Sequence, residues 1–358
     1  MLFLLLATAV LATGTAVLLF VVQGGLRRAS RRKEGFWRRF LLRQLLLLPL
    51  LYFGVLPCLL GVVGSRMVRT RHDEASYGGP AFDGKGNWIV QDRTSLRSGP
   101  PQHAVAPSLA KTLRLASLDG TALRAFLVPT LEGRPHAVAV LVHGLFRSAM
   151  EVEPVAVMLR ELDVEVLLLE LANHGGSGRR RCTFGKREKD DVLAAVAYLR
   201  QRKGGFGAPL LLFGVSLGGV AAALAAPEIP ELGGLVLDAP MTAMSDTAYR
   251  QLARFGFPRV FSHVALWSLE CASGVDLDAI RPVDALRALP PTLPSLLVGA
   301  GHDYRVPPEV VRAAFAALRA PEGRKELWVA PESRHGQVWL DRPAEYRQRL
   351  TALLARMR

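Results

Sequence analysis

A serine flanked by glycines separates a strand-like stretch from a helix-like stretch of this chain. Ser216 is the centre of a Gly-Val-Ser-Leu-Gly motif at 214–218, which follows the apolar run 209–213 and precedes the small-residue run 219–224. A strand that turns sharply into a helix holds its central residue in a strained conformation, and glycines two residues away leave room for the turn. The motif therefore predicts that Ser216 Oγ is an exposed nucleophile, with the backbone N–H of Leu217 directed at the same place.

A serine nucleophile needs a base to take its proton and an acid to orient that base. We expect the base to be His335, which follows the predicted strand 327–330 and is the one histidine after Asp303. Asp303 is the expected acid, because it follows the predicted strand 294–299. A side chain at the carboxyl end of a parallel strand faces the crevice where such sheets bind ligands. Asp238, at the end of the preceding strand, is the alternative acid.

The same chemistry needs donors for the negative charge that develops on the carbonyl oxygen. His143 and Gly144 follow the predicted strand 138–142. Gly144 allows the backbone to turn so that the N–H of Leu145 reaches that oxygen. We therefore expect an oxyanion hole formed by the backbone N–H groups of Leu145 and Leu217, with His143 as a structural hydrogen-bonding residue.

These segments together resemble the α/β-hydrolase superfamily over residues 113–356. Within that superfamily the chain is similar to membrane-associated serine hydrolases and esterases that look like prolyl-oligopeptidase catalytic domains. The resemblance rests on His143-Gly144, the runs 173–178 and 184–191, the 214–218 motif, and the Asp303 and His335 loops. It implies hydrolysis of an ester, thioester or amide, and it implies that no cofactor is used. No His and Cys spacing in the sequence fits a metal site.

The order of predicted elements agrees with this fold. Two opening strands, 112–116 and 123–128, are followed by short Val- and Leu-rich runs that alternate with amphipathic helices, which indicates βαβ units. We predict an α/β class and an α/β-hydrolase fold, with a mostly parallel sheet flanked by helices. The stretch 241–289 has helix-like apolar spacing and predicts a small helical cap, either a substrate-binding lid or a pair of helices that only packs. The other predicted elements are the helices 149–162 and 188–202 and the strands 164–171 and 235–238.

The first part of the chain is apolar enough for a membrane. Residues 1–26 carry no charged side chain, and two stretches, 3–22 and 44–65, have the length and composition of transmembrane helices. The first stretch lacks the basic start of a cleavable signal peptide, so we expect a retained transmembrane hairpin. The predicted division is a membrane anchor at 1–72, a linker rich in Gly, Pro, Ser and Asn at 73–107, and a hydrolase domain at 108–358.

Charge predicts the orientation of this anchor. The loop 23–43 carries eight basic side chains against the single acid Glu34. The positive-inside rule places such a loop in the cytoplasm, so we expect the catalytic domain to be extracytoplasmic. Pro49 and Pro57 interrupt the second stretch, and a re-entrant or interfacial segment there is the alternative, with the domain on the cytoplasmic face.

The net charge of +14 does not indicate a nucleic-acid partner. Residues 1–72 carry 11 basic and 1 acidic side chain, so +10 of that charge belongs to the membrane flank, where it can bind anionic lipid headgroups. The cluster Arg179–Arg181 is interpreted as a solvated loop, with attraction of an acidic substrate as the alternative. We predict an ester hydrolase that acts on a small-molecule or lipid ester at a membrane. A peptidase or amidase of the prolyl-oligopeptidase type, or a non-enzymatic binding protein, are the alternatives.

Overall fold

The computed structural model describes residues 43–45, 47–67, 81–82, 88–90, 103–105, 110–130, 133, 135–202 and 205–357. These residues divide into two compact units. One, the anchor unit, holds the described part of 43–64 together with Tyr249–Ala272. The other, the hydrolase unit, holds the described parts of Ser65–Ala248 and Ser273–Arg358.

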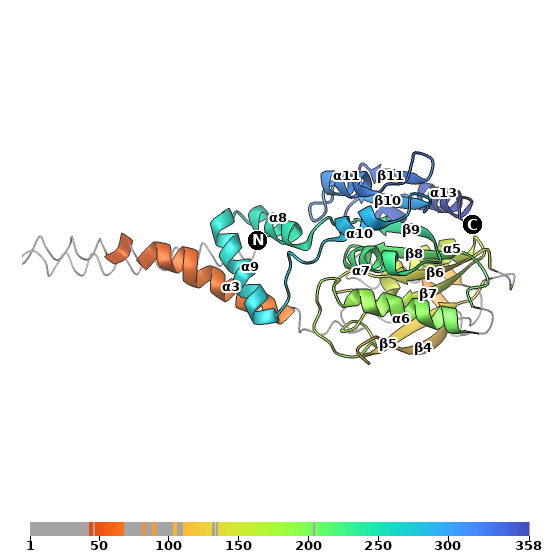
Figure 1. The fold of residues 1–358 in the computed structure, drawn as a ribbon, viewed down its shortest axis with the longest axis horizontal. Helices are drawn as coiled ribbons and strands as arrows, with labels where there is room; N and C mark the ends of the chain where they lie inside the picture. The colour runs from red at the N-terminus through yellow and green to blue at the C-terminus, as the bar shows by residue number, and fades with distance from the viewer. Residues whose placement is uncertain are drawn as a thin grey trace, which may run out of the picture. The chain divides into compact units, whose positions relative to one another are not determined.

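An eight-stranded sheet forms the centre of the hydrolase unit (Figure 1). Its strand order is β11-β10-β9-β8-β6-β7-β5-β4, with parallel pairing from β11 to β7 and antiparallel pairing of β5 with both β7 and β4. The predicted α/β-hydrolase fold is thereby confirmed. The strands are β4 (Lys111–Ala116), β5 (Ala122–Val128), β6 (Ala137–Val142), β7 (Val164–Leu169), β8 (Leu210–Val215), β9 (Leu232–Asp238), β10 (Ser295–Ala300) and β11 (Lys325–Ala330).

Helices cover the sheet and bury its central strands. Every residue of β6 and β8 is buried, because a parallel strand with helices on both faces has no solvated side. The long helices of this unit are α5 (Glu153–Arg160), α6 (Glu188–Gln201), α7 (Leu217–Ala225), α10 (Pro282–Ala288), α11 (Pro308–Ala317) and α13 (Pro343–Leu354), with the short α12 (Val338–Asp341) before the last.

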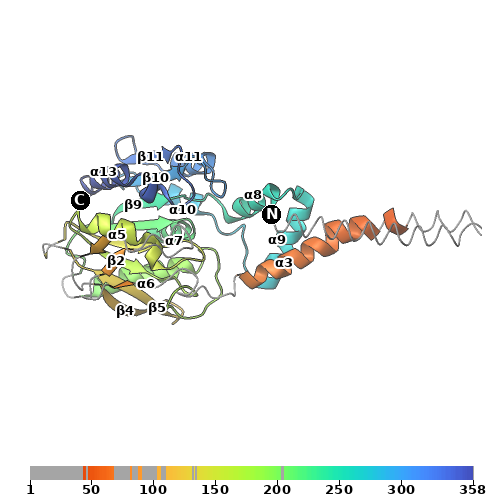
Figure 2. The same ribbon diagram turned by 180° about the vertical axis from the view of Figure 1, so that it is seen from behind.

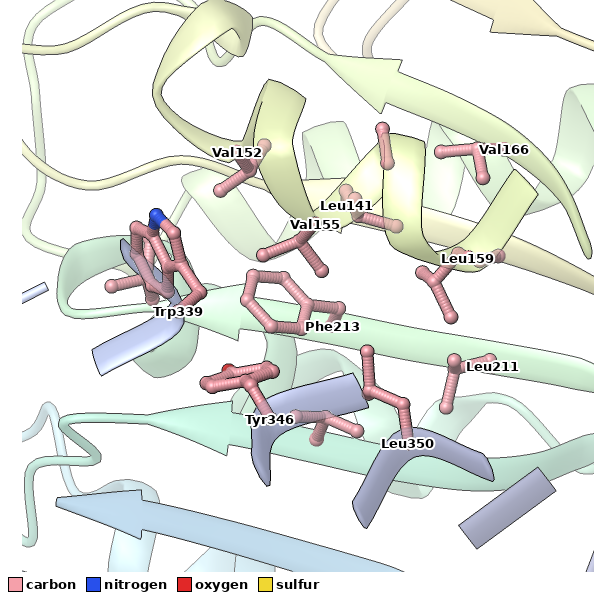
Figure 3. Close-up of a cluster of buried hydrophobic side chains, with 14 of the residues drawn as sticks. Leu141, Val152, Val155, Leu159, Val166, Leu211, Phe213, Trp339, Tyr346 and Leu350 are labelled. Carbon is pink, nitrogen blue, oxygen red and sulfur yellow. The ribbon is translucent and has the colours of Figure 1, made fainter. Parts of the chain in front are cut away.

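One hydrophobic cluster joins the sheet to α5, α12 and α13 (Figure 3). Phe213 of β8 meets Trp339 of α12 in an edge-on contact with 6.3 Å between ring centroids. Trp339 in turn meets Tyr346 of α13 at 6.1 Å. Val155 and Leu159 of α5 also belong to this cluster. This packing holds the final helices, and the loop that precedes them, against the ends of the central strands.

Several element boundaries differ from the sequence prediction for local reasons. The predicted helix 149–162 begins as a 3-10 turn, η2 (Ala149–Val152), because Ser148 Oγ accepts the N–H of Met150. The predicted strand 164–171 ends at Leu169, and the N–H of Leu171 donates to the His143 ring instead of to a strand neighbour. The strand predicted at 235–238 begins earlier, at Leu232, where it pairs with β8.

The predicted linker contains regular structure. Three short strands, β1 (Ala81–Phe82), β2 (Trp88–Val90) and β3 (His103–Val105), form a small antiparallel sheet. Strands of two or three residues leave too short a pattern to be predicted from the sequence.

The anchor unit contains one long apolar helix. Within the described part of the chain, Arg43–Arg66 is the one helix long and apolar enough to cross a membrane, with a mean hydropathy of 2.4. It includes a π-helical turn, η1 (Leu51–Val55), followed by α3 (Leu56–Met67). This helix corresponds to the predicted stretch 44–65. The predicted stretch 3–22 lies outside the described residues, so the hairpin stays a prediction.

The insertion at 241–289 is helical, and α9 from its middle packs on α3. It contains α8 (Met244–Arg254) and α9 (Arg259–Ser273) before α10. Both views of the fold show α9 beside α3 (Figures 1 and 2). Ser268 Oγ donates to the carbonyl oxygen of Cys58 at 2.9 Å. A Cβ on Gly61 would lie 2.3 Å from the carbonyl oxygen of Ala265, so only glycine allows this approach.

Candidate active site

Ser216 lies in the sharp turn between β8 and α7. Its φ of 53° and ψ of −115° form the strained conformation that the motif predicts. Both flanking glycines are required by close backbone contacts. A Cβ on Gly214 would lie 2.3 Å from the carbonyl oxygen of Gly218, and a Cβ on Gly218 would lie 2.3 Å from that of Val142. The Ser216 N–H donates to the carbonyl oxygen of Asp238 at 2.9 Å, which attaches the turn to the neighbouring strand.

Asp303 and His335 form a hydrogen-bonded pair. His335 Nδ1 lies 2.6 Å from Asp303 Oδ2, and the Asp303 side chain is fully buried. The second carboxylate oxygen, Oδ1, accepts the backbone N–H groups of Arg305 at 2.8 Å and Val306 at 2.9 Å. With Nδ1 donating to Asp303, the other nitrogen of the ring is the one able to accept a proton.

The alternative acid, Asp238, has a different partner. The hydroxyl of Tyr346 donates to Asp238 Oδ2 at 3.1 Å, and both residues are buried. Burial raises the pKa of Asp238 to about 8, with the Tyr346 hydrogen bond opposing that rise and the neighbouring Asp303 charge adding to it. Burial therefore favours the protonated form of Asp238, and its hydrogen-bond partner is Tyr346, whereas His335 is paired with Asp303.

The loops that carry Ser216, His335 and Gly144 meet at one edge of the sheet. A Cβ on Gly336, next to His335, would lie 3.8 Å from Cγ2 of Val215, next to Ser216. A Cβ on Gly144 would lie 3.5 Å from Cβ of Ser216. The structure thus brings the His335 loop and the Gly144 loop against the serine turn.

Two buried histidines hold the Gly144 loop. Leu171 N–H donates to His143 Nε2 at 3.2 Å, and His143 Nδ1 lies 2.7 Å from the carbonyl oxygen of Gly144. Burial and the neighbouring His174 lower the pKa of His143 to about 3, so its ring is neutral. His174 Nε2 accepts the N–H of Phe146 at 3.3 Å. Both rings therefore support the loop as hydrogen-bonding groups, and His143 has the structural role that the sequence indicates.

Two backbone donors are available beside Ser216. Among the described residues, the N–H groups of Leu145 and Leu217 have no hydrogen-bond partner. Leu145 is in the Gly144 loop and Leu217 is the first residue of α7, so its N–H belongs to the positive end of a helix dipole. Two such donors can stabilise an oxyanion.

Sequence reasoning missed a buried network behind the site. Arg180 is interpreted from the sequence as solvated, but its side chain is only 6% exposed and its Nη2 lies 2.8 Å from Asp191 Oδ2. Asp191 also accepts Ser117 Oγ–H at 2.6 Å and the N–H of Ala172 at 2.9 Å. Burial is the main cause that raises the pKa of Asp191 to about 6. The network stabilises the segment that carries His174. Its charged residues are too far apart in the sequence for a pattern to predict that they pair.

Sequence reasoning also missed Glu151, whose carboxylate contacts the Gly144 loop. Its Oε2 accepts the N–H of Gly144 at 2.6 Å. An acidic residue shortly after the loop was the available signal, but only the 3-10 turn η2 directs this side chain back to the loop. In the part of the chain that the structure describes, no group of three or more His, Cys, Asp or Glu side chains is arranged to hold a metal ion.

A family model and a curated protein match the hydrolase part of the chain. Residues 133–281 match the family model described as "Serine aminopeptidase, S33". The uncharacterized protein YqkD of Bacillus subtilis is 23% identical over 248 residues, which cover 65% of this chain and 79% of YqkD.

Solved structures show the same fold at low identity. An esterase of Pyrococcus furiosus, Pf2001, superposes with a TM-score of 0.57 at 20% identity, covering 69% of this chain and 91% of that one. Est1E of Butyrivibrio proteoclasticus, solved with ferulic acid bound, has a TM-score of 0.52 at 19% identity and covers 66% of this chain and 97% of its own. The sheet topology and these likenesses together show that the hydrolase unit has the α/β-hydrolase fold.

Proposed function

We propose that this protein is a serine hydrolase that cleaves a carboxylic ester through an acyl-Ser216 intermediate. The observation that carries the proposal is the 2.6 Å bond between His335 and the buried Asp303, in a loop that packs beside the strained Ser216 turn. A nucleophile, a base and an orienting acid on three loops of one sheet edge are what acyl transfer requires.

Each proposed residue has a role in the acylation step. Ser216 Oγ attacks the ester carbonyl carbon while its proton moves to Nε2 of His335, and the carbonyl oxygen becomes an oxyanion. The N–H groups of Leu145 and Leu217 stabilise that oxyanion. Asp303 holds the imidazole by Nδ1–H and stabilises the imidazolium.

Collapse of the tetrahedral intermediate breaks the bond to the alcohol, which leaves with the proton from His335. The acyl group is then attached to Ser216. In the second half, water attacks the acyl carbon and gives a proton to His335, and the acid product leaves as the proton returns to Ser216 Oγ. Atoms and charge balance without a cofactor.

A fluorophosphonate probe tests the proposed nucleophile, because it reacts only with an activated serine. We expect the full-length protein to be labelled and the Ser216→Ala variant to remain unlabelled. Equal labelling of both proteins would remove Ser216 from the mechanism. Absence of labelling in the wild type would favour the alternative of a non-enzymatic binding protein.

A peptidase or amidase is the second candidate, because the matching family model is described as a serine aminopeptidase. A panel of p-nitrophenyl esters of increasing chain length, compared with aminoacyl and peptidyl anilides, separates the two. We expect kcat/KM for the best ester to exceed that for the best anilide. The reverse order would make the peptidase the better description.

We further propose that the enzyme is anchored to a membrane and that its substrate is an acyl ester found there. The helix Arg43–Arg66 supports the anchor, since it combines a mean hydropathy of 2.4 with a window that is only 12% buried. The eight basic residues of 23–43 favour an extracytoplasmic catalytic domain.

The orientation is tested by C-terminal fusions in bacterial cells. We expect an alkaline phosphatase fusion, which is active only outside the cytoplasm, to be active, and a green fluorescent protein fusion to stay dark. The opposite pair of results would place the catalytic domain on the cytoplasmic face, which is the alternative.

A further inference from the structure

The Glu151 carboxylate lies where the three loops of the proposed active site meet. Its Oε2 accepts the Gly144 N–H at 2.6 Å and would lie 3.1 Å from a Cβ on Gly144. Ser216 Cβ lies 3.5 Å from that same Cβ position. On the other side, Glu151 Oε1 would lie 3.9 Å from a Cβ on Gly336, the residue after His335. The carboxylate therefore contacts the oxyanion loop and lies close to both the nucleophile turn and the base.

The backbone explains why this side chain points inward. Ser148 caps η2 by accepting the Met150 N–H, and Glu151 N–H donates to the Ser148 carbonyl oxygen at 3.1 Å. This turn reverses the chain directly after the oxyanion loop, so the side chain of Glu151 returns to Gly144. Only 11% of that side chain is exposed.

Three charged or titratable groups face the Glu151 carboxylate. Arg147 Nε lies 3.4 Å from Oε1, and His335 and Asp238 are close enough to interact electrostatically. Burial raises the pKa of Glu151, while the Gly144 N–H, Arg147 and a protonated His335 favour its ionised form. Glu151 is thus a second carboxylate beside His335, in addition to Asp303, which is hydrogen-bonded to the ring.

We propose that Glu151 is a positioning residue that orients the oxyanion loop and stabilises the protonated form of His335 during acyl transfer. The inference rests on the proposed serine hydrolase function. Accepting the Gly144 N–H sets the orientation of Gly144, and hence of the following peptide, whose N–H belongs to Leu145. A negative charge near an imidazole favours the imidazolium that forms when Ser216 gives up its proton.

Two substitutions separate these contributions. Glu151→Gln keeps an oxygen that can accept the Gly144 N–H but removes the charge, whereas Glu151→Ala removes both. Full-length protein in detergent is assayed for kcat and KM with a p-nitrophenyl ester between about pH 5 and pH 9. We expect Glu151→Ala to lower kcat by about 10- to 100-fold with KM within about twofold, as for lost transition-state stabilisation.

The contribution of the Glu151 charge is measured from the pH dependence of kcat/KM. Activity requires neutral His335, and removal of a nearby negative charge lowers the pKa of a histidine. We therefore expect Glu151→Gln to move the acid limb of kcat/KM to lower pH by about half a unit, with a smaller loss of kcat. Arg147→Gln, which removes the positive charge beside Glu151, should move the same limb to higher pH.

Glu161→Gln is the matched control, since Glu161 forms an ion pair with Arg347 on the exposed surface. It should leave kcat and the pH profile unchanged. A kcat for Glu151→Ala within twofold of wild type, or unshifted acid limbs for both Glu151→Gln and Arg147→Gln, would overturn the inference.

Fluorophosphonate labelling distinguishes failure of the Glu151 inference from failure of the proposed serine hydrolase function. Folded Glu151 variants are labelled slowly but completely, whereas Ser216→Ala is not labelled. Full labelling of Ser216→Ala would instead reject the proposed function itself.

Discussion

The two units of the molecule differ in whether their large apolar side chains are buried or exposed. In the hydrolase unit these side chains are inside, and Leu118 and Tyr304 are the large apolar residues exposed there among those described. The described part of the anchor unit exposes large apolar side chains along the Arg43–Arg66 helix, on α9 and in the turn before α9. These are Leu45, Leu47, Leu48, Leu50, Leu51, Phe53, Val55, Leu59, Val62, Val63, Phe255, Val260 and Trp267.

This difference supports the proposal that the anchor unit contacts a membrane. The hydrolase unit is stabilised by removing apolar surface from water into its own core. The anchor unit uses its small residues for helix contact, with Gly61 against Ala265 and Ser268 Oγ bonded to a backbone carbonyl, which is typical of helix pairs in lipid. Its exposed apolar surface supports the proposed membrane anchor, while the proposed catalytic residues belong to the hydrolase unit.

The largest effect is expected from the proposed nucleophile and base. Ser216→Ala and His335→Ala should each lower kcat for ester hydrolysis by about 10³-fold or more, because the two residues act as a unit. Retention of the protein in the membrane fraction should not change, since neither residue is in the anchor unit. Ester turnover within tenfold of wild type in either variant would contradict the assignment.

The acid is tested by a matched pair of substitutions. Asp303→Asn should lower kcat by about 10²-fold or more, though less than loss of Ser216, because the orientation of His335 is lost. Asp238→Asn should stay within about threefold of wild type at pH 7, because that carboxyl is already protonated. An inactive Asp238→Asn beside an active Asp303→Asn would move the acid to Asp238.

A pH dependence of stability should arise from Asp238. Its pKa is raised from 3.8 to about 8 in the folded state, so the folded form binds a proton that the unfolded form releases. Its contribution is fully present below pH 3.8 and is lost as pH rises to about 8, a change of a few kcal/mol in order of magnitude.

Thermal unfolding of full-length protein in detergent measures this effect. Asparagine carries no charge at any pH and can still accept the Tyr346 hydroxyl. The Tm of Asp238→Asn relative to wild type should therefore increase between about pH 5 and pH 8. A constant difference in Tm across that range would show that Asp238 does not titrate in the folded protein.

The smallest effect is a change in fluorescence from the anchor unit. Trp267 is 57% exposed on α9, on the side away from the contact with α3. In vesicles of brominated phosphatidylcholine, we expect Trp267→Phe to lower the fraction of tryptophan emission that the lipid quenches.

Trp328→Phe is the control for that measurement, because Trp328 is buried in the hydrolase unit at 7% exposure. Removing an emitter that lipid does not reach should raise the quenched fraction. A quenched fraction that does not fall in Trp267→Phe would mean that this face of α9 does not meet lipid.

The positions of the proposed catalytic residues were predictable because each is in a loop that begins where a strand ends. Ser216, Asp303 and His335 each belong to a loop at the carboxyl end of a recognisable apolar run, and parallel strands bring such ends to one edge. The glycines around Ser216 were predictable for the same local reason, and the structure gives the contacts that require them.

Other features depend on contacts between distant segments. Pairing of α9 with α3 joins Ser268 to Cys58, and the apolar spacing of the insertion does not indicate which surface it meets. Which of Asp303 and Asp238 lies against the His335 ring likewise depends on how the loops pack.

The sequence by itself determined the alternation of strands and helices, the strained serine turn and the apolar N-terminal part, because local periodicity and glycine spacing encode each of them. Only the tertiary structure decided which charges are buried together. Protonation of Asp238 beside Tyr346, the Arg180–Asp191 pair and the return of Glu151 to the Gly144 loop all follow from side-chain direction and burial, which depend on how the whole chain packs.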